Sequence, residues 1–203
     1  MILQATKKMQ DFIGVKTAEV PDETEQFQSW HANLFYLNRK KCLLLTHNES
    51  IYSLFLYNVS KKEVPTLTER IKEQLKEQMR RDDFTIAQIA YMVESLAEIR
   101  YAKTSDRRVL GYMNDMVHAV KWYAEYEGTV DVSDLNRRIN ETPYKKADYA
   151  YSKDELKHRL SNRCESRSNI GIQSLLSSIE KGLDDVQERK TKPIDHLWNE
   201  IDG

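Results

Sequence analysis

The sequence predicts an α+β fold: an antiparallel meander sheet packed by three or more helices and followed by a helical C-terminal tail. Two observations lead to this prediction. Between residues 32 and 59, short stretches rich in Leu, Phe and Tyr alternate with polar turns, which is typical of strands. Between residues 65 and 140, apolar residues instead recur every three or four positions, the spacing of helices that cover a sheet.

The strand boundaries follow from the polar turns at residues 38–40 and 47–49. Consecutive strands joined by turns this short pair antiparallel, so a meander is expected. A short apolar start at residues 2–6 precedes a helix over 7–14, where Gly14 is placed as a stop. The meander strands are expected at residues 32–37, 41–46 and 51–56.

Capping residues locate the helices that follow the sheet. Thr66 and Glu69 have the spacing of a capping box, in which each side chain accepts a hydrogen bond from the other residue's backbone N–H. Gly128 is suited to end the long helix before it. The four helices are expected to begin near residues 66, 85, 105 and 131.

The chain changes character after Pro143. Residues 1–143 are read as the α+β domain, and residues 144–172, poor in aliphatic side chains, as a linker with a short helix at 152–160. Residues 173–203 form the tail, with amphipathic helices expected at Gln173–Glu188 and Pro193–Ile201.

Composition narrows the classes of partner. The 31 basic and 32 acidic residues give a net charge of -1, so nucleic-acid binding is possible only through a local patch. Two distant cysteines, Cys42 and Cys164, do not form a disulfide framework. The N-terminus lacks the pattern of a signal peptide, and no apolar run is long enough for a bilayer. We expect a cytoplasmic protein with no membrane partner.

Motifs for catalysis or cofactor binding do not occur in the sequence. The five histidines lack zinc-ligand spacing, the glycines are isolated rather than grouped in a phosphate-binding loop, and no nucleophile elbow is found. We therefore expect no metal, no cofactor and, on balance, no enzymatic activity.

One polar face is an alternative site. In a helix that starts near Ser105, Arg107, Asn114 and His118 recur on one side, with Arg108 beside them. With Lys103 or Arg39 nearby, this face would bind RNA or a nucleotide, and His118 would be the acid or base of any hydrolysis. The simpler interpretation is that this segment only caps the start of the helix, and that Arg107 and Arg108 face solvent without binding a ligand.

Three short stretches of the N-terminal part stand out: Asn33-Leu34-Phe35, Arg108-Val109-Leu110-Gly111 and Met113-Asn114-Asp115-Met116. With them, about residues 1–150 resemble a family of small bacterial proteins of unknown function. The resemblance implies a bacterial, cytoplasmic domain and assigns no activity.

The segment Ile179–Ile201 is similar to the C-terminal segments of small antitoxins of the prevent-host-death and related kinds, which fold onto a partner toxin. The glycine that often follows the acidic helix in such tails is replaced here by Glu188. The resemblance implies a non-enzymatic interaction protein with a toxin-like partner, and Trp198 is the expected anchor. Self-association through the tail, or docking on the chain's own domain, stays an alternative. The expected partner-binding residues are Leu183, Val186, Ile194, Leu197, Trp198 and Ile201.

Overall fold

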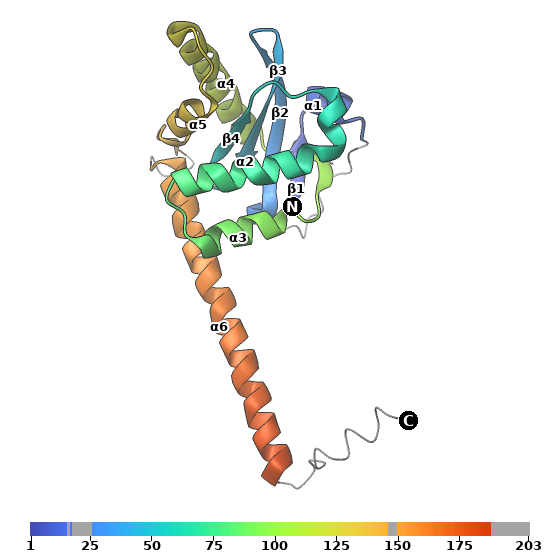
Figure 1. The fold of residues 1–203 in the computed structure, drawn as a ribbon, viewed down its shortest axis with the longest axis vertical. Coiled ribbons are helices and arrows are strands. Elements are labelled where there is room, and N and C mark those ends of the chain that lie inside the picture. The colour runs from blue at the N-terminus through green and yellow to red at the C-terminus, as the bar shows by residue number, and fades with distance from the viewer. Residues whose placement is uncertain (16, 18–25, 146–149, 188–203) are drawn as a thin grey trace. The chain divides into compact units, whose positions relative to one another are not determined.

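A computed structural model describes residues 1–15, 17, 26–145 and 150–187 of the chain (Figure 1). Its strands form one five-stranded sheet with the order β4-β3-β2-β1-β5. The strands are β1 (Ile2–Ala5), β2 (Ser29–Leu37), β3 (Lys40–His47), β4 (Ser53–Leu56) and β5 (Arg100–Lys103). The α-helices are α1 (Lys7–Ile13), α2 (Leu67–Arg81), α3 (Ile86–Ser95), α4 (Arg107–Glu127), α5 (Val132–Asn140) and α6 (Ser152–Gln187).

The α+β class is confirmed, but the prediction of an antiparallel sheet is wrong for part of it. Strands β2, β3 and β4 form the expected antiparallel meander. Strand β1, however, pairs in parallel with both β2 and β5. The chain passes through α1 between β1 and β2, and a connection of this length allows the second strand to run in the same direction as the first. The sheet is therefore mixed.

Helices cover both faces of the sheet. Because successive side chains of a strand point to opposite faces, β3 contributes to two separate cores: Leu43 and Leu45 to one, Cys42 and Leu44 to the other. The first core is closed by α1, α2, α3 and the first turns of α6, and the second by α4 and α5. Figure 1 shows α2 and α3 crossing one face. Burial on both faces explains why β3 is apolar at consecutive positions.

The outer edge of β4, where no further described strand pairs, is covered by two asparagines of α5. The Asn136 side chain accepts from the Phe55 N–H (2.7 Å) and donates to the Phe55 carbonyl (3.0 Å). Asn140, one turn later, accepts from the Ser53 N–H (2.8 Å) and donates to the Ser53 carbonyl (2.8 Å). A side-chain amide carries the same donor and acceptor as a backbone peptide group, so the two amides act as a substitute for a neighbouring strand.

The helix starts are capped, although not always by the expected residues. Asp106 caps α4 and Asp131 caps α5, each through hydrogen bonds from two backbone N–H groups. The capping box expected for Thr66 and Glu69 is not formed. A 3₁₀ turn over Lys61–Thr66 precedes α2, so Thr66 is not extended as an N-cap requires, and its hydroxyl donates to the Glu63 carbonyl instead.

The segment predicted as a linker is largely helical. The expected short helix at residues 152–160 continues through 161–172, so α6 is a single helix of 36 residues. No proline interrupts it, and hydroxyls within it are satisfied by carbonyls one turn back, as for Ser161 with Lys157 and Ser166 with Asn162. The chain divides into two units, residues 1–161 and 162–203. The domain boundary expected after Pro143 stays a prediction.

Replacing Asn140 tests the role of the amides at the edge of β4. We expect Asn140→Ala to lower the free energy of unfolding by about 2 to 4 kcal/mol, since the buried Ser53 N–H and carbonyl each lose a partner. Arg137→Ala, on the exposed side of the same helix, is the matched control and should cost less than about 1 kcal/mol. Chemical denaturation measures both values, and equal losses would contradict the assigned role.

Candidate functional site

The polar face predicted on the third long helix lies on α4. Arg107, Arg108, Asn114 and His118 are all exposed there, as is Lys103 at the end of β5. The Asp106 carboxylate accepts hydrogen bonds from the N–H groups of Arg108 (2.8 Å) and Val109 (3.3 Å). A carboxylate of the chain itself therefore occupies the place where a helix start would bind an external anion. The four residues share a helical surface, and the two cavities described below are lined by other residues.

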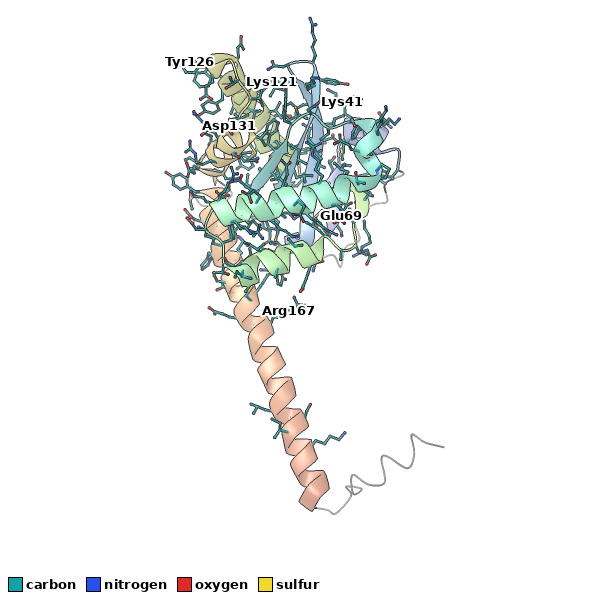
Figure 2. All side chains as sticks on the ribbon, in the orientation of Figure 1. Lys41, Glu69, Lys121, Tyr126, Asp131 and Arg167 are labelled. Atoms are coloured by element: carbon teal, nitrogen blue, oxygen red, sulfur yellow. The ribbon has the colours of Figure 1, made fainter. Side chains whose placement is uncertain are left out.

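Two aromatic residues continue this face and were not singled out from the sequence. Trp122 lies one turn after His118, and Tyr126 one turn further, at the C-terminal end of α4 (Figure 2). Their rings stack with centroids 5.2 Å apart and an interplanar angle of 9°. Both are exposed, by 57% and 77%. The spacing of four residues from His118 to Trp122 and from Trp122 to Tyr126 is the sequence pattern that indicates that these residues share one face of the helix. The use of the face for RNA or nucleotides stays a prediction.

A cleft of about 310 Å³ lies where the end of α2 meets α5 and the start of α6. Asp82 lines it with only 4% of its surface exposed. One carboxylate oxygen, Oδ2, accepts from the Tyr52 hydroxyl (2.7 Å) and from Gln78 Nε2 (3.0 Å). Burial raises the pKa of Asp82 above its ordinary value, although both hydrogen bonds and the charges of Lys153 and Lys157 oppose the increase.

Most charges around this cleft are paired with one another. Arg137 binds Asp134 (2.6 Å) and Glu141 (2.7 Å), and Glu141 also binds Lys153 (2.6 Å). The hydrogen bond from Lys153 and then that from Arg137 hold the pKa of Glu141 below its usual value, against the effect of burial. These pairs join α5 to the start of α6. The ion pairs around the cleft therefore have a structural role, and Asp82 is the buried carboxyl group that lines the cleft below them.

The distal half of α6 carries a stripe of apolar residues. Leu176 and Ile179 are 53% and 50% exposed, although each is a large aliphatic side chain. Leu183 and Val186, predicted as partner-binding residues, lie in the same helix at positions that continue the stripe. With Ile172, the spacing alternates four and three residues. The other predicted residues lie outside the described part of the chain: Ile194, Leu197, Trp198 and Ile201.

The described residues contain no metal site of the usual kind, because nowhere among them do three or more His, Cys, Asp or Glu side chains lie close enough together to hold an ion. Among the described helices, including α6, none has the apolar length that a membrane crossing requires.

Comparison with known proteins agrees with part of what the sequence predicted. Residues 2–155 match a family model described as a domain of unknown function, DUF6933. This match confirms the expected resemblance of the N-terminal part to an uncharacterised family. No curated protein matches the chain. The similarity of residues 179–201 to antitoxin tails stays a prediction.

The buried carboxyl group gives a pH-dependent prediction. Since the pKa of Asp82 is higher in the folded state than its ordinary value of 3.8, the unfolded chain loses this proton first as pH rises. Stability contributed by the protonated carboxyl is thus present below 3.8 and is lost as pH rises through the folded pKa. The stability of the wild type relative to Asp82→Asn should therefore fall with rising pH and then level off.

Asp134→Asn is the matched control for this prediction. Burial alone would raise the pKa of Asp134, but hydrogen bonds from Arg137 and Arg138 outweigh it and lower the pKa. The wild type should gain stability relative to this variant as pH rises toward 3.8. Urea unfolding at a series of pH values measures both slopes, and slopes of the same sign would refute the assignment for Asp82.

Proposed function

The chain belongs to the DUF6933 family of domains of unknown function, and from that premise we propose that it is a non-enzymatic interaction protein. In this proposal it binds a partner protein through the apolar stripe of α6, defined as Ile172, Leu176, Ile179, Leu183 and Val186. The observation that carries the proposal is the exposure of Leu176 and Ile179 on successive turns of one helix. Because each side chain is about half exposed, burying the remainder of both stabilises a complex by about 1.5 to 3 kcal/mol before the costs of association.

The organisation of the second unit supports this use of the stripe. Its described part, residues 162–187, is a single stretch of helix. Within these described residues no second element is present against which the apolar stripe can be buried, and isolated helices are marginal in water without such packing. Burial of the stripe therefore requires a surface outside residues 162–187.

The spacing of the stripe indicates what kind of surface fits it. Apolar residues separated alternately by four and three positions lie along one side of a helix, the arrangement that helices use to pack against another helix or into an apolar groove. The stripe covers Ile172 to Val186, so contact along four helical turns is available.

The tail beyond α6 supports a finer version of the proposal. Residues 179–201 are similar to the toxin-binding segments of small antitoxins, which favours a toxin-like partner. In that version Leu197 and Trp198 extend the contact made by α6, and Trp198 is the anchor, because large aromatic residues contribute most to interface energies.

A charge placed within the stripe tests the proposal. We expect Leu176→Asp to abolish recovery of the partner in affinity capture from the native host, since a carboxylate would be buried in the interface. Ser177→Asp, an exposed neighbour on another side of the helix, adds the same charge and should retain the partner. Mass spectrometry identifies what each protein captures. Equal capture by both variants would exclude the stripe as the contact.

Trp198→Ala tests the finer version. It should weaken the complex at least tenfold, because interface hot-spot tryptophans commonly contribute 2 kcal/mol or more. Residues 1–161 should unfold at an unchanged temperature, measured by circular dichroism. A lowered unfolding temperature would instead show that Trp198 packs against the chain's own domain.

A further inference from the structure

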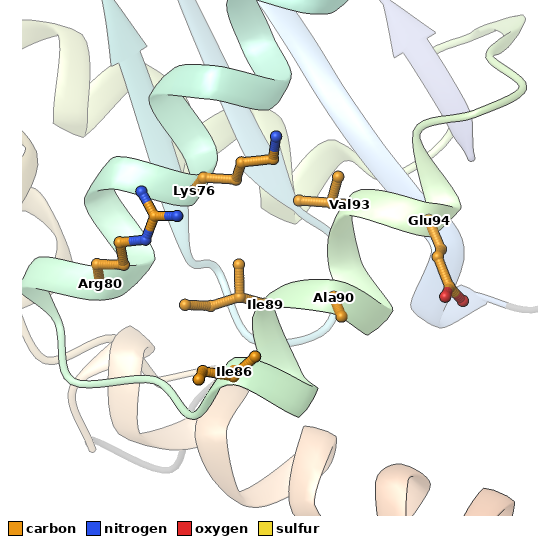
Figure 3. A pocket seen from close by; sticks show the side chains of 7 residues that line it. All are labelled: Lys76, Arg80, Ile86, Ile89, Ala90, Val93 and Glu94. Atoms are coloured by element: carbon orange, nitrogen blue, oxygen red, sulfur yellow. The ribbon is translucent and has the colours of Figure 1, made fainter.

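A groove of about 360 Å³ runs between α2 and α3 (Figure 3). Its α3 side is apolar and consists of Ile86, Ile89, Ala90 and Val93, which span two turns of the helix. Ile89 forms the buried floor, whereas Ile86, the first residue of α3, is 87% exposed. A single exposed isoleucine does not indicate a binding site, but Ile86 extends the apolar lining of a groove, and contiguous apolar surface does.

The α2 side of the groove is cationic. Lys76 and Arg80 project from α2, one helical turn apart, as Figure 3 shows. Lys76 is paired with Glu73 (2.7 Å), but Arg80 reaches Glu77 only at 4.0 Å, and two thirds of its side chain is exposed. Arg80 therefore retains donors for a further carboxylate. Glu94, at the far end of α3, completes the lining.

We propose that this groove binds the stripe of α6 from a second copy of the chain. The proposal rests on the proposed function, since the same stripe makes the contact, and it names the partner. The first argument is length. From Ile86 to Val93 and from Leu176 to Leu183 the separation is seven residues in each case, or about 10 Å of helix, so two turns of stripe match two turns of groove.

The second argument is charge complementarity. Glu180 and Asp184 follow each other at i, i+4 in α6, on one flank of the stripe. Lys76 and Arg80 have the same i, i+4 spacing on one flank of the groove. When the stripe lies against α3, the two acidic positions of α6 face Lys76 and Arg80 of α2. Opposite charges on the two flanks favour this orientation, whereas charges of the same sign would repel each other.

In the proposed dimer two such contacts form, with each copy placing its stripe in the groove of the other. This reciprocal pair closes the dimer with twofold symmetry and covers two of the four turns of each stripe. Binding of another protein to the stripe would require this contact to open.

The molar mass of the full chain, measured by sedimentation velocity over a range of concentrations, tests the proposal. A dimer is expected, and Ile86→Asp should make it monomeric, because the charge would enter an apolar contact. Ile86 is so exposed that its replacement leaves the core intact. Tyr126→Asp, at an exposed aromatic residue on α4, is the matched control and should remain dimeric.

Charge exchange tests the orientation. Lys76→Glu with Arg80→Glu, and separately Glu180→Lys with Asp184→Lys, should each weaken the dimer about tenfold or more. Combining all four substitutions should restore most of the affinity, since opposite charges face each other again. Circular dichroism confirms that each variant is folded. Failure of the combination to restore binding overturns the proposed orientation.

Other outcomes separate this inference from the proposed function. A chain that is monomeric at every concentration overturns the inference, and a host partner that depends on Leu176 would then still support the proposed function. A dimer that Leu176→Asp abolishes but Ile86→Asp does not shows pairing between two stripes, which also overturns the groove as the binding site. A dimer unaffected by Leu176→Asp overturns the inference as well.

Discussion

Asn140 connects three parts of the fold through one side chain. Its amide pairs with both backbone groups of Ser53 in β4, and its nitrogen also donates to the Asn136 carbonyl. Its Oδ1 and its backbone carbonyl accept from the Ser152 hydroxyl at the start of α6 (3.0 and 3.2 Å). The side chain is fully buried, so every donor and acceptor must have a partner. The sheet edge, α5 and the first residue of α6 are thereby held in one arrangement.

The first turns of α6 are fixed by further contacts of the same domain. Leu156 and Leu160 are buried in the first core, and Arg159 binds Glu49 (2.8 Å). Gln88, whose side chain accepts from the Thr85 N–H in the capping box of α3, also donates to the Lys157 carbonyl and to Ser161. One residue therefore both completes the cap of α3 and contacts the first turns of α6. The domain holds the beginning of the helix whose continuation carries the stripe.

Local signals in the sequence predicted much of this fold. The meander over β2 to β4, the burial of Val109, Met113 and Val120 on α4, and the stop at Gly128 follow from periodicity and capping. The parallel pairing of β1 depends on contacts between distant segments, which periodicity does not contain. The continuity of α6 does not follow from the sequence, because its polar residues over 161–172 are also typical of a linker, and a helix needs an apolar face only where it is packed.

The candidate sites also divide into those that local sequence patterns predict and those that depend on contacts between distant segments. The polar face of α4 and the stripe of α6 each lie on one helix, so spacing alone places their residues together. The groove between α2 and α3 and the carboxyl group beneath the polar cleft each combine residues from separate elements. Asp82 in particular reads as an ordinary residue after a helix, and only the packing of Tyr52 and Gln78 against it changes its chemistry.

The two edges of the sheet differ in how they avoid aggregation. Strand β5 is short and carries exposed Arg100 and Lys103, and charges at an edge discourage pairing with another chain. Strand β4 reads Ser-Leu-Phe-Leu and has no such charges, and its outer edge is instead paired with the asparagines of α5. Local opening of α5 would expose an apolar strand edge while the rest of the sheet remained folded. Resistance to aggregation should therefore follow the local stability of α5 rather than the global free energy of unfolding.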